Sequence, residues 1–435
     1  MQVCLLLLVA SAASAQVLAR PGLAGSGLKN SPWWQHAVFY QVDRSPDSLD
    51  FKAIPARLDA LRSLGVDALL LPAPELPAPG TNAAMPSFDD LDNLLRQASA
   101  HRIRVLLTIH ASSPTADLSG VARFWLTRGV AGLHLAAAPG TSPDDARAAV
   151  QKLRKLASTF AGQRIILNDL DVAETANDAQ TKRLTTNRTS RTANASAMQL
   201  QIDNRADRLS TLDAASLRPL LAQSIADPNL LLDLHAPASP NQRSPLAEAT
   251  AAIALLTRPA ALIDANLVLQ PTPEPQPEAP EESAKPAAPR PPAAPPGTFL
   301  PYVPYVPPPK PKVATAPKPE LVDPLTSWYQ QLAALRGSNI ALRSGSKTLL
   351  DFDAQNTLVW VSRPASPSGR TPPAFVAINL SSSPVQLSLA EAIKKLNLHG
   401  FFLRTLLRSD QAMGAQDINA VSLPPFGVYI GELRL

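Results

Sequence analysis

The sequence predicts an α/β fold, a (β/α)8 barrel followed by a C-terminal antiparallel β-sandwich. Between residues 31 and 269, eight short apolar segments alternate with segments of helical period. Apolar strands joined by helices are typical of a parallel sheet that is covered on both faces. Eight such units fit a barrel at the small end of the usual size range. Beyond residue 345, short strand-like segments separated by turn residues are typical of a sandwich.

The alternation runs through the whole barrel segment. The first predicted strand ends the segment 31–42, and the others are residues 68–72, 105–109, 132–137, 164–168, 198–202, 230–234 and 261–266. The predicted helices are residues 54–64, 88–100, 121–128, 143–159, 213–225 and 245–257. Ser87 is the predicted N-cap of the second helix, since acidic residues fill the turn that follows it. The polar segment 174–196 is predicted to be a loop.

The segment 124–137 carries the most information about function. It predicts the end of a helix, a glycine turn at Gly129 and a buried strand that begins at Gly132. Barrel enzymes place their chemistry at the C-terminal ends of the strands, so the last residues of this strand are expected to face a pocket.

The N-terminal residues 1–15 predict a secretory signal peptide. A short apolar stretch precedes the small residues Ala13, Ser14 and Ala15, and it is too short to span a bilayer. We expect cleavage near Ala15 and a secreted or periplasmic protein, with a retained membrane anchor as the alternative. Cys4, the single cysteine, lies inside this segment, so the mature chain should contain no disulfide.

Residues 270–322 predict a Pro-rich linker without a packed core. Residues 270–320 hold 19 of the 45 prolines, and such segments favour extended polyproline II. A spacer is the simpler interpretation, and a ligand for a partner protein is the alternative. Residues 323–435 should then form the last barrel helix, over 325–336, and the β-sandwich. The six predicted sandwich strands are residues 348–352, 357–362, 374–380, 385–389, 403–407 and 427–433.

The net charge of +5 does not predict a nucleic-acid partner, because the basic residues are scattered and no helix face combines them with aromatic residues. The six histidines show no spacing typical of metal ligands, and no glycine-rich loop follows a strand to hold a phosphate. We therefore expect no cofactor, no metal and no nucleic-acid partner.

Taken in order, the chain resembles the α-amylase family of glycoside hydrolases, family 13. The resemblance implies the barrel and sandwich just predicted. Its segments are 33–41 (WWQHAVFYQ), 58–69 (LDALRSLGVDAL), 88–107, 255–263 (LLTRPAALI), 332–345, 375–381 (FVAINLS) and 423–428 (LPPFGV).

The same resemblance implies that the catalytic residues are missing. The family's fourth-strand pattern G-V-D-G-F-R-x-D-A falls on residues 129–137, which places its arginine on His134 and its nucleophile on Ala136. The seventh-strand pattern N-H-D falls on Leu234, His235 and Ala236. The third-strand pattern D-x-x-x-N-H falls on Thr108, Ser112 and Ser113.

The acid on the fifth strand has an ambiguous counterpart, Asn168 or Asp169, with Asp171 as a further candidate. A retaining glycosidase needs two carboxyl groups beside the scissile bond, and an acid without a nucleophile does not supply this mechanism. An alternative is that Asp169, Asp233 and Asp264 form a substitute set, with His235 as a remnant of the site. The simpler interpretation is that these acids are solvated or cap loops at strand ends.

The sequence therefore predicts a catalytically inactive protein with a binding or scaffold role, whose partner is a protein or an α-glucan. The alternative is an active glycoside hydrolase or transglycosylase that acts on α-glucans. The sequence does not predict the oligomeric state.

Overall fold

The computed structural model describes residues 32–42, 49–77, 86–110, 117–136, 143–169, 199–203, 205–206, 209, 212–227, 229–234, 245–264, 324–352, 356–364 and 371–435. The predicted signal peptide (1–15), the loop 174–196 and the Pro-rich linker (270–322) lie outside these residues. No helix among the described residues has the length and apolar character needed to cross a membrane.

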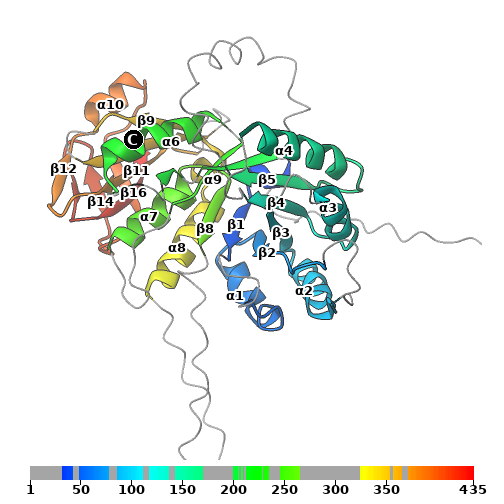
Figure 1. Ribbon diagram of the computed structural model, residues 1–435. Helices are drawn as coiled ribbons and strands as arrows, with labels where there is room; N and C mark the ends of the chain where they lie inside the picture. Colours follow the sequence, from blue (N-terminus) through cyan, green and yellow to red (C-terminus); the bar gives the residue numbers. More distant parts are fainter. Residues whose placement is uncertain are drawn as a thin grey trace, which may run out of the picture.

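Eight parallel strands form a nearly closed barrel, as the sequence predicts (Figure 1). The strands are β1 (Val38–Gln41), β2 (Ala68–Pro72), β3 (Arg104–His110), β4 (Gly132–Ala136), β5 (Ile165–Asp169), β6 (Gln199–Asp203), β7 (Leu230–Leu232) and β8 (Ala261–Asp264). Their order is β7-β6-β5-β4-β3-β2-β1-β8, so β1 to β6 each pair with the next strand in the sequence, and β8 returns to pair with β1. Within the described part of the chain, no ladder joins β7 to β8.

The predicted helices follow their strands. They are α1 (Leu58–Ser63), which continues the short 3-10 helix η3 (Pro55–Arg57), α2 (Asp89–Ala100), α3 (Leu118–Thr127), α4 (Pro143–Ala157), α6 (Ala214–Ala226), α7 (Pro245–Leu256) and α8 (Pro324–Ser338). The prediction that Ser87 is the N-cap of α2 is wrong by one residue, since Phe88 occupies that position. The Ser87 hydroxyl still accepts a hydrogen bond from the backbone N–H of Asp89, at 3.3 Å.

Alternation along the strands separates two apolar layers. Phe39, Leu106 and Leu167 belong to the inner layer, which fills the barrel. The residues next to them in the sequence, Tyr40, Leu107 and Ile166, belong to the outer layer beneath the helices. A side chain's position in this alternation therefore shows whether it faces the barrel interior.

The C-terminal region contains a six-stranded antiparallel sheet and a smaller two-stranded one. The larger sheet has the order β14 (Ala415–Asp417), β13 (Phe402–Arg408), β16 (Val428–Arg434), β11 (Ala374–Asn379), β10 (Thr357–Arg363), β9 (Ser346–Leu350). The smaller sheet pairs β12 (Val385–Leu387) with β15 (Val421–Leu423), and α9 (Ile340–Ser344) and α10 (Ala390–Lys395) complete the region. All six predicted strands are present, but α9, α10, β14 and β15 were not predicted.

Both faces of the larger sheet are buried. Val359 and Phe375 pack with residues of the small sheet and α10. Trp360 and Val376, on the opposite face, pack into the layer that also contains the barrel helices.

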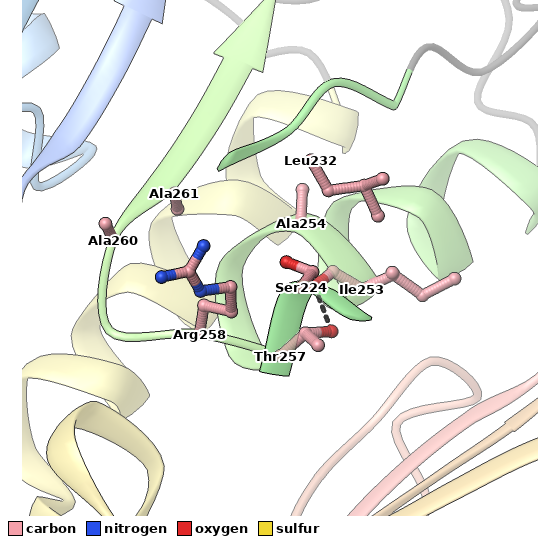
Figure 2. Close-up of a pocket in the computed structure, with 8 residues that line it drawn as sticks. All are labelled: Ser224, Leu232, Ile253, Ala254, Thr257, Arg258, Ala260 and Ala261. Atoms are coloured by element: carbon pink, nitrogen blue, oxygen red, sulfur yellow. Dashed lines mark hydrogen bonds between the residues drawn. The ribbon is translucent and has the colours of Figure 1, made fainter. Parts of the chain in front are cut away.

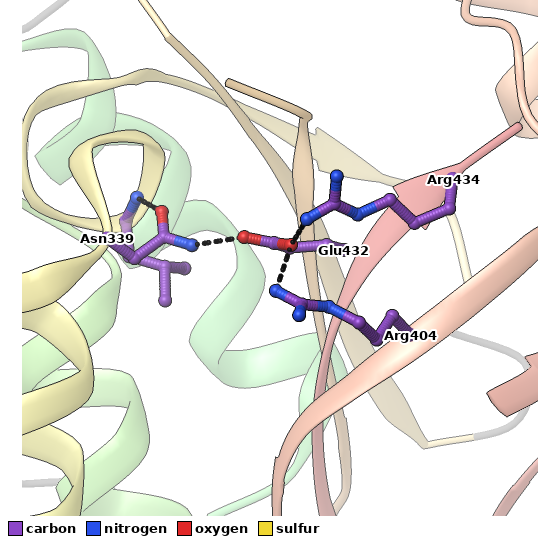
Figure 3. Close-up of polar contacts among 5 residues, drawn as sticks. Asn339, Arg404, Glu432 and Arg434 are labelled. Carbon is purple, nitrogen blue, oxygen red and sulfur yellow. Dashed lines mark hydrogen bonds and ion pairs between the residues drawn. The ribbon is translucent and has the colours of Figure 1, made fainter. Parts of the chain in front are cut away.

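Polar contacts complete this junction between barrel and sandwich (Figure 3). The buried Glu432 of β16 accepts hydrogen bonds from Asn339 Nδ2 at 2.9 Å, Arg404 Nη2 at 2.8 Å and Arg434 Nη2 at 2.6 Å. Asn339 in turn caps α9 by accepting the N–H of Leu342.

Candidate functional site

The candidate site lies at the C-terminal ends of β3, β4 and β5, where the resemblance places the family's chemistry. Leu133 and Leu135 of β4 belong to the outer apolar layer. The residues that alternate with them, His134 and Ala136, therefore face the barrel interior. A glycine starts this strand because a side chain at this position would meet the backbone of β5. A Cβ on Gly132 would lie 2.3 Å from the backbone oxygen of Ile165.

Three inward-facing side chains form a hydrogen-bonded chain across the strands. Thr108 Oγ1 lies 3.2 Å from His134 Nδ1, and His134 Nε2 lies 2.9 Å from Asp169 Oδ1. The His134 side chain is almost fully buried, and that of Asp169 is 20% exposed. The structure thus joins Thr108, His134 and Asp169, which the sequence identified one by one without predicting their contact.

Ala136 lies beside the same acid. The ladder between β4 and β5 pairs Leu135 with Asn168, so the next residues, Ala136 and Asp169, are neighbours at the end of these strands. Neighbouring strands are about 4.8 Å apart. A carboxylate at residue 136 would therefore have the spacing that a retaining glycosidase needs, but residue 136 is an alanine. Of the two candidates on the fifth strand, Asp169 lies two residues after the inward-facing Leu167, whereas Asn168 lies two residues after the outward-facing Ile166.

The other predicted acids are distributed around the barrel. Asp233 follows β7 and lies two residues after the inward-facing Leu231. Its backbone N–H donates to the carbonyl oxygen of Asp203 at 2.9 Å. Asp264 ends β8 and is paired in the ladder with Gln41 of β1. Leu234 is buried, whereas Ser112, Ser113, Asp171, His235 and Ala236 lie outside the described residues.

A buried acid close to this site has a structural partner. Asp203, the last residue of β6, binds Arg205 through both carboxylate oxygens, with distances of 2.7 Å to Nε and 2.6 Å to Nη2. It lies one residue after the inward-facing Ile202, so its side chain points to the outer side of the barrel. Asp203 is therefore not a member of the inward-facing set.

The sequence interpretation did not identify Gln41 as a site residue. It ends β1 and lies two residues after the inward-facing Phe39, so its side chain also faces the barrel interior. Its Oε1 atom is buried, and among the described residues no donor reaches it. The alternation of Phe39 and Gln41 was a signal that could have identified this residue.

The pocket shown in Figure 2 is separate from this site. Its lining includes Ser224 of α6, Leu232 of β7 and Ala261 at the start of β8. Its volume of about 10 Å³ is room for about one water molecule. It cannot hold a sugar.

Comparison with solved structures identifies similar folds. The chain matches the trehalulose synthase MutB from Pseudomonas mesoacidophila MX-45 at 14% identity, with a TM-score of 0.57, over 93% of this chain and 100% of that one. A MutB mutant in complex with glucose matches at 15% identity, with a TM-score of 0.58 and the same coverage. The isomaltulose synthase from Erwinia rhapontici NX5 matches at 13% identity, with a TM-score of 0.55, over 93% of this chain and 99% of that one. No family model matches the chain, and no curated protein does.

These likenesses show a shared fold. They support the resemblance to family 13 at the level of the barrel and its C-terminal β domain, and identities of 13 to 15% carry no catalytic residue across. What this site can do must therefore follow from its own side chains. It offers a carboxylate, an imidazole, a hydroxyl and an amide oxygen, which can all form hydrogen bonds to a polar ligand. Among the described residues, no group of three or more His, Cys, Asp or Glu side chains is placed to bind a metal.

Proposed function

We propose that this chain is a catalytically inactive protein with the α-amylase-type fold, which binds a small saccharide at the mouth of its barrel without cleaving it. The observation that carries the proposal is the pair of positions at the ends of β4 and β5. Ala136 supplies no carboxylate beside Asp169, and Asp169 forms a hydrogen bond with His134. A retaining mechanism needs a nucleophile and an acid about 5 Å apart, and only one of the two is present at this position.

Saccharide binding is supported by the chemistry of the inward-facing groups. Hydroxyl groups of a sugar both donate and accept, and the site presents acceptors at Asp169 and Gln41 as well as the Thr108 hydroxyl. A MutB mutant of similar fold has been solved in complex with glucose. An α-glucan end or a disaccharide is therefore the ligand class we propose, and a scaffold role toward a protein partner is the alternative.

Activity assays test the first half of the proposal. The purified chain should release no sugar from starch, maltooligosaccharides, sucrose or aryl α-glucosides. The variants Asp169→Asn and Asp233→Asn should give the same result. Turnover that disappears in either variant would refute the inactive interpretation.

One observation favours an inverting glycosidase as the second candidate. Asp169 on β5 and Asp233 after β7 are separated by the single strand β6, which gives a backbone spacing of roughly 10 Å. Inverting enzymes hold their carboxyl groups about 6.5–9.5 Å apart. Inversion of the anomeric centre, together with loss of turnover in both variants, would establish this candidate.

Calorimetric titration tests the second half, with glucose, sucrose and maltotriose as probes. We expect His134→Phe to weaken saccharide binding by at least tenfold, because it removes the partner of Asp169 and a polar group of the site. The matched control is His101→Phe, which removes another His–Asp pair, a contact of 3.2 Å between His101 and the exposed Asp59 of α1. Equal binding by the chain and both variants, or no binding by the intact chain, would leave the scaffold role.

We also propose that the protein acts outside the cytoplasm, on the evidence of the predicted signal peptide. The expected observation is a mature N-terminus at Gln16, measured by mass spectrometry of protein from the native envelope. An intact Met1 in the exported protein would favour a retained anchor.

A further inference from the structure

At the opposite end of the barrel, four basic side chains gather where the barrel meets the sandwich. We call them the junction cations: His36, just before β1, Arg336 in the last turn of α8, Arg343 of α9 and Lys347 of β9. Arg336 lies in the protein interior, 5% exposed, and the other three are half-buried. Arg336 donates to the carbonyl oxygen of Pro259, which precedes β8. His36 and Arg336 therefore lie at the N-terminal ends of β1 and β8.

Little negative charge balances this group. Asp67, just before β2, is the acid that acts on Arg336, and its Oδ2 also accepts the backbone N–H of Val38 at 3.1 Å. The next carboxylate along the junction, Glu432, is already bound by Asn339, Arg404 and Arg434. Among the described residues, the junction thus carries more positive than negative charge.

Several donors at this place have no acceptor. Among the described residues, the buried Nε atoms of Arg336 and Arg343 have no hydrogen-bond partner, and neither has the hydroxyl of Ser362. Ser362 is fully buried and lies opposite Lys347 in the ladder between β9 and β10. Lys347 donates from Nζ to the carbonyl oxygens of Ala341 at 3.1 Å and Leu342 at 2.7 Å. Unpaired buried polar groups are costly, and the two guanidinium Nε–H groups can only donate, so they call for an acceptor from outside the chain.

The pKa values of the junction cations reflect the same imbalance. Burial and, to a smaller extent, the charge of Arg336 lower the pKa of Lys347 to about 7. Burial and then Arg336 and Arg343 lower the pKa of His36. Burial lowers the pKa of Arg336 to about 10, with Asp67 opposing the shift and Arg343 adding to it. An anion placed among these groups would relieve all three shifts.

We propose that the junction cations bind a tetrahedral oxyanion, phosphate or sulfate, from solvent. Guanidinium groups present N–H donors in a fixed fork that suits such an oxyanion, and an ammonium adds a compact charge. Arg343 and Lys347 are half-buried, so they connect the buried Arg336 and Ser362 to solvent. The bound anion would link α8, α9 and β9 to the N-terminal ends of the barrel strands. This site is independent of the saccharide site at the barrel mouth.

Thermal unfolding and calorimetry with inorganic phosphate and sodium sulfate test the proposal. We expect a saturable rise in unfolding temperature with either anion, beyond that of sodium chloride at equal ionic strength. Arg343→Gln should weaken binding at least tenfold. The same change at Arg96, an exposed residue of α2, is the matched control and should not alter binding. Because Arg343 lies partly in solvent, we expect Arg343→Gln to fold. Its circular dichroism spectrum checks this.

Proton uptake supplies an independent readout. At pH 8 Lys347, on which Arg336 acts, is mostly uncharged, and an added dianion should favour its protonated form. Sulfate titrations in two buffers of different ionisation enthalpy should therefore show an uptake approaching one proton, which Lys347→Met abolishes. Sulfate itself exchanges no proton at this pH.

Three outcomes would overturn the proposal. They are no saturable binding of phosphate or sulfate, equal binding by Arg343→Gln and the intact chain, and a chloride effect equal to that of the oxyanions.

Discussion

Lys347 makes the stability of this protein depend on pH in a range where few side chains titrate. Its folded pKa is about 7, whereas the ordinary value of a lysine is 10.5. The unfolded chain therefore binds more protons than the folded one between pH 7 and 10.5. Because the unfolded state binds the extra proton, the free energy of unfolding should rise as pH rises through this range. Lys347→Met, which fills a similar volume without charge, should remove this dependence.

The size of the effect follows from the two pKa values. At pH 7 the group opposes folding by about 4 kcal/mol, and at pH 9 by about 2 kcal/mol. The intact chain should thus gain about 2 kcal/mol over these two pH units from Lys347. The variant loses two hydrogen bonds to carbonyl oxygens, each with a net contribution of about 1 kcal/mol. It should be more stable than the intact chain at pH 7, and the two should be about equal near pH 9.

The assay is urea unfolding of the intact chain and of Lys347→Met at pH 7, 8 and 9, in buffer without phosphate or sulfate. This range lies above that of His36, whose lowered pKa makes the protein less stable as pH falls below about 6.5. The quantity to compare is the slope of unfolding free energy against pH. Parallel slopes for the two proteins would refute the reasoning, whatever their absolute stabilities.

Three further substitutions test packing and polar contacts, each by urea unfolding. Glu432→Ala should cost about 3 kcal/mol, because it leaves the Nδ2 of the buried Asn339 without its acceptor, while Glu391→Ala on α10 should cost little. A result within 1 kcal/mol of that control would contradict the role given to Glu432. Gly132→Ala should cost about 1–3 kcal/mol, since its Cβ would overlap the backbone oxygen of Ile165, and an unchanged midpoint would show that β4 and β5 can separate freely. Trp328→Phe should cost about 1–3 kcal/mol by removing the Nε1 donor to the carbonyl oxygen of Glu248, at 3.0 Å, and a neutral effect would mean that water replaces it.

The barrel could be predicted from the sequence because its strands are short apolar segments between helices of clear period. Residues 68–72 and 105–109 show this pattern, and the structure places β2 and β3 there within one residue at each end. The strands β14 and β15 escaped prediction because each has three residues, too few to show a period.

The candidate site was only partly predictable. The sequence located His134, Ala136 and Asp169 near strand ends, but the contact between His134 and Asp169 depends on the register of β4 with β5. Register is set by three-dimensional packing. The junction cations have the same limitation, since His36 and Arg343 are separated by some 300 residues and interact only because α8 and α9 pack at the N-terminal ends of the barrel strands.

The larger sandwich sheet, apolar on both faces, makes the C-terminal region dependent on the barrel for its solubility. Antiparallel sheets commonly turn one face to water, but here Trp360, Val376 and Ile430 form a second apolar face that the barrel side covers. A fragment that contained only residues 346–435 would expose this face and should aggregate. The sandwich should therefore not fold as an independent domain. A change that destabilises the barrel near α8 should also cause misfolding of the C-terminal region.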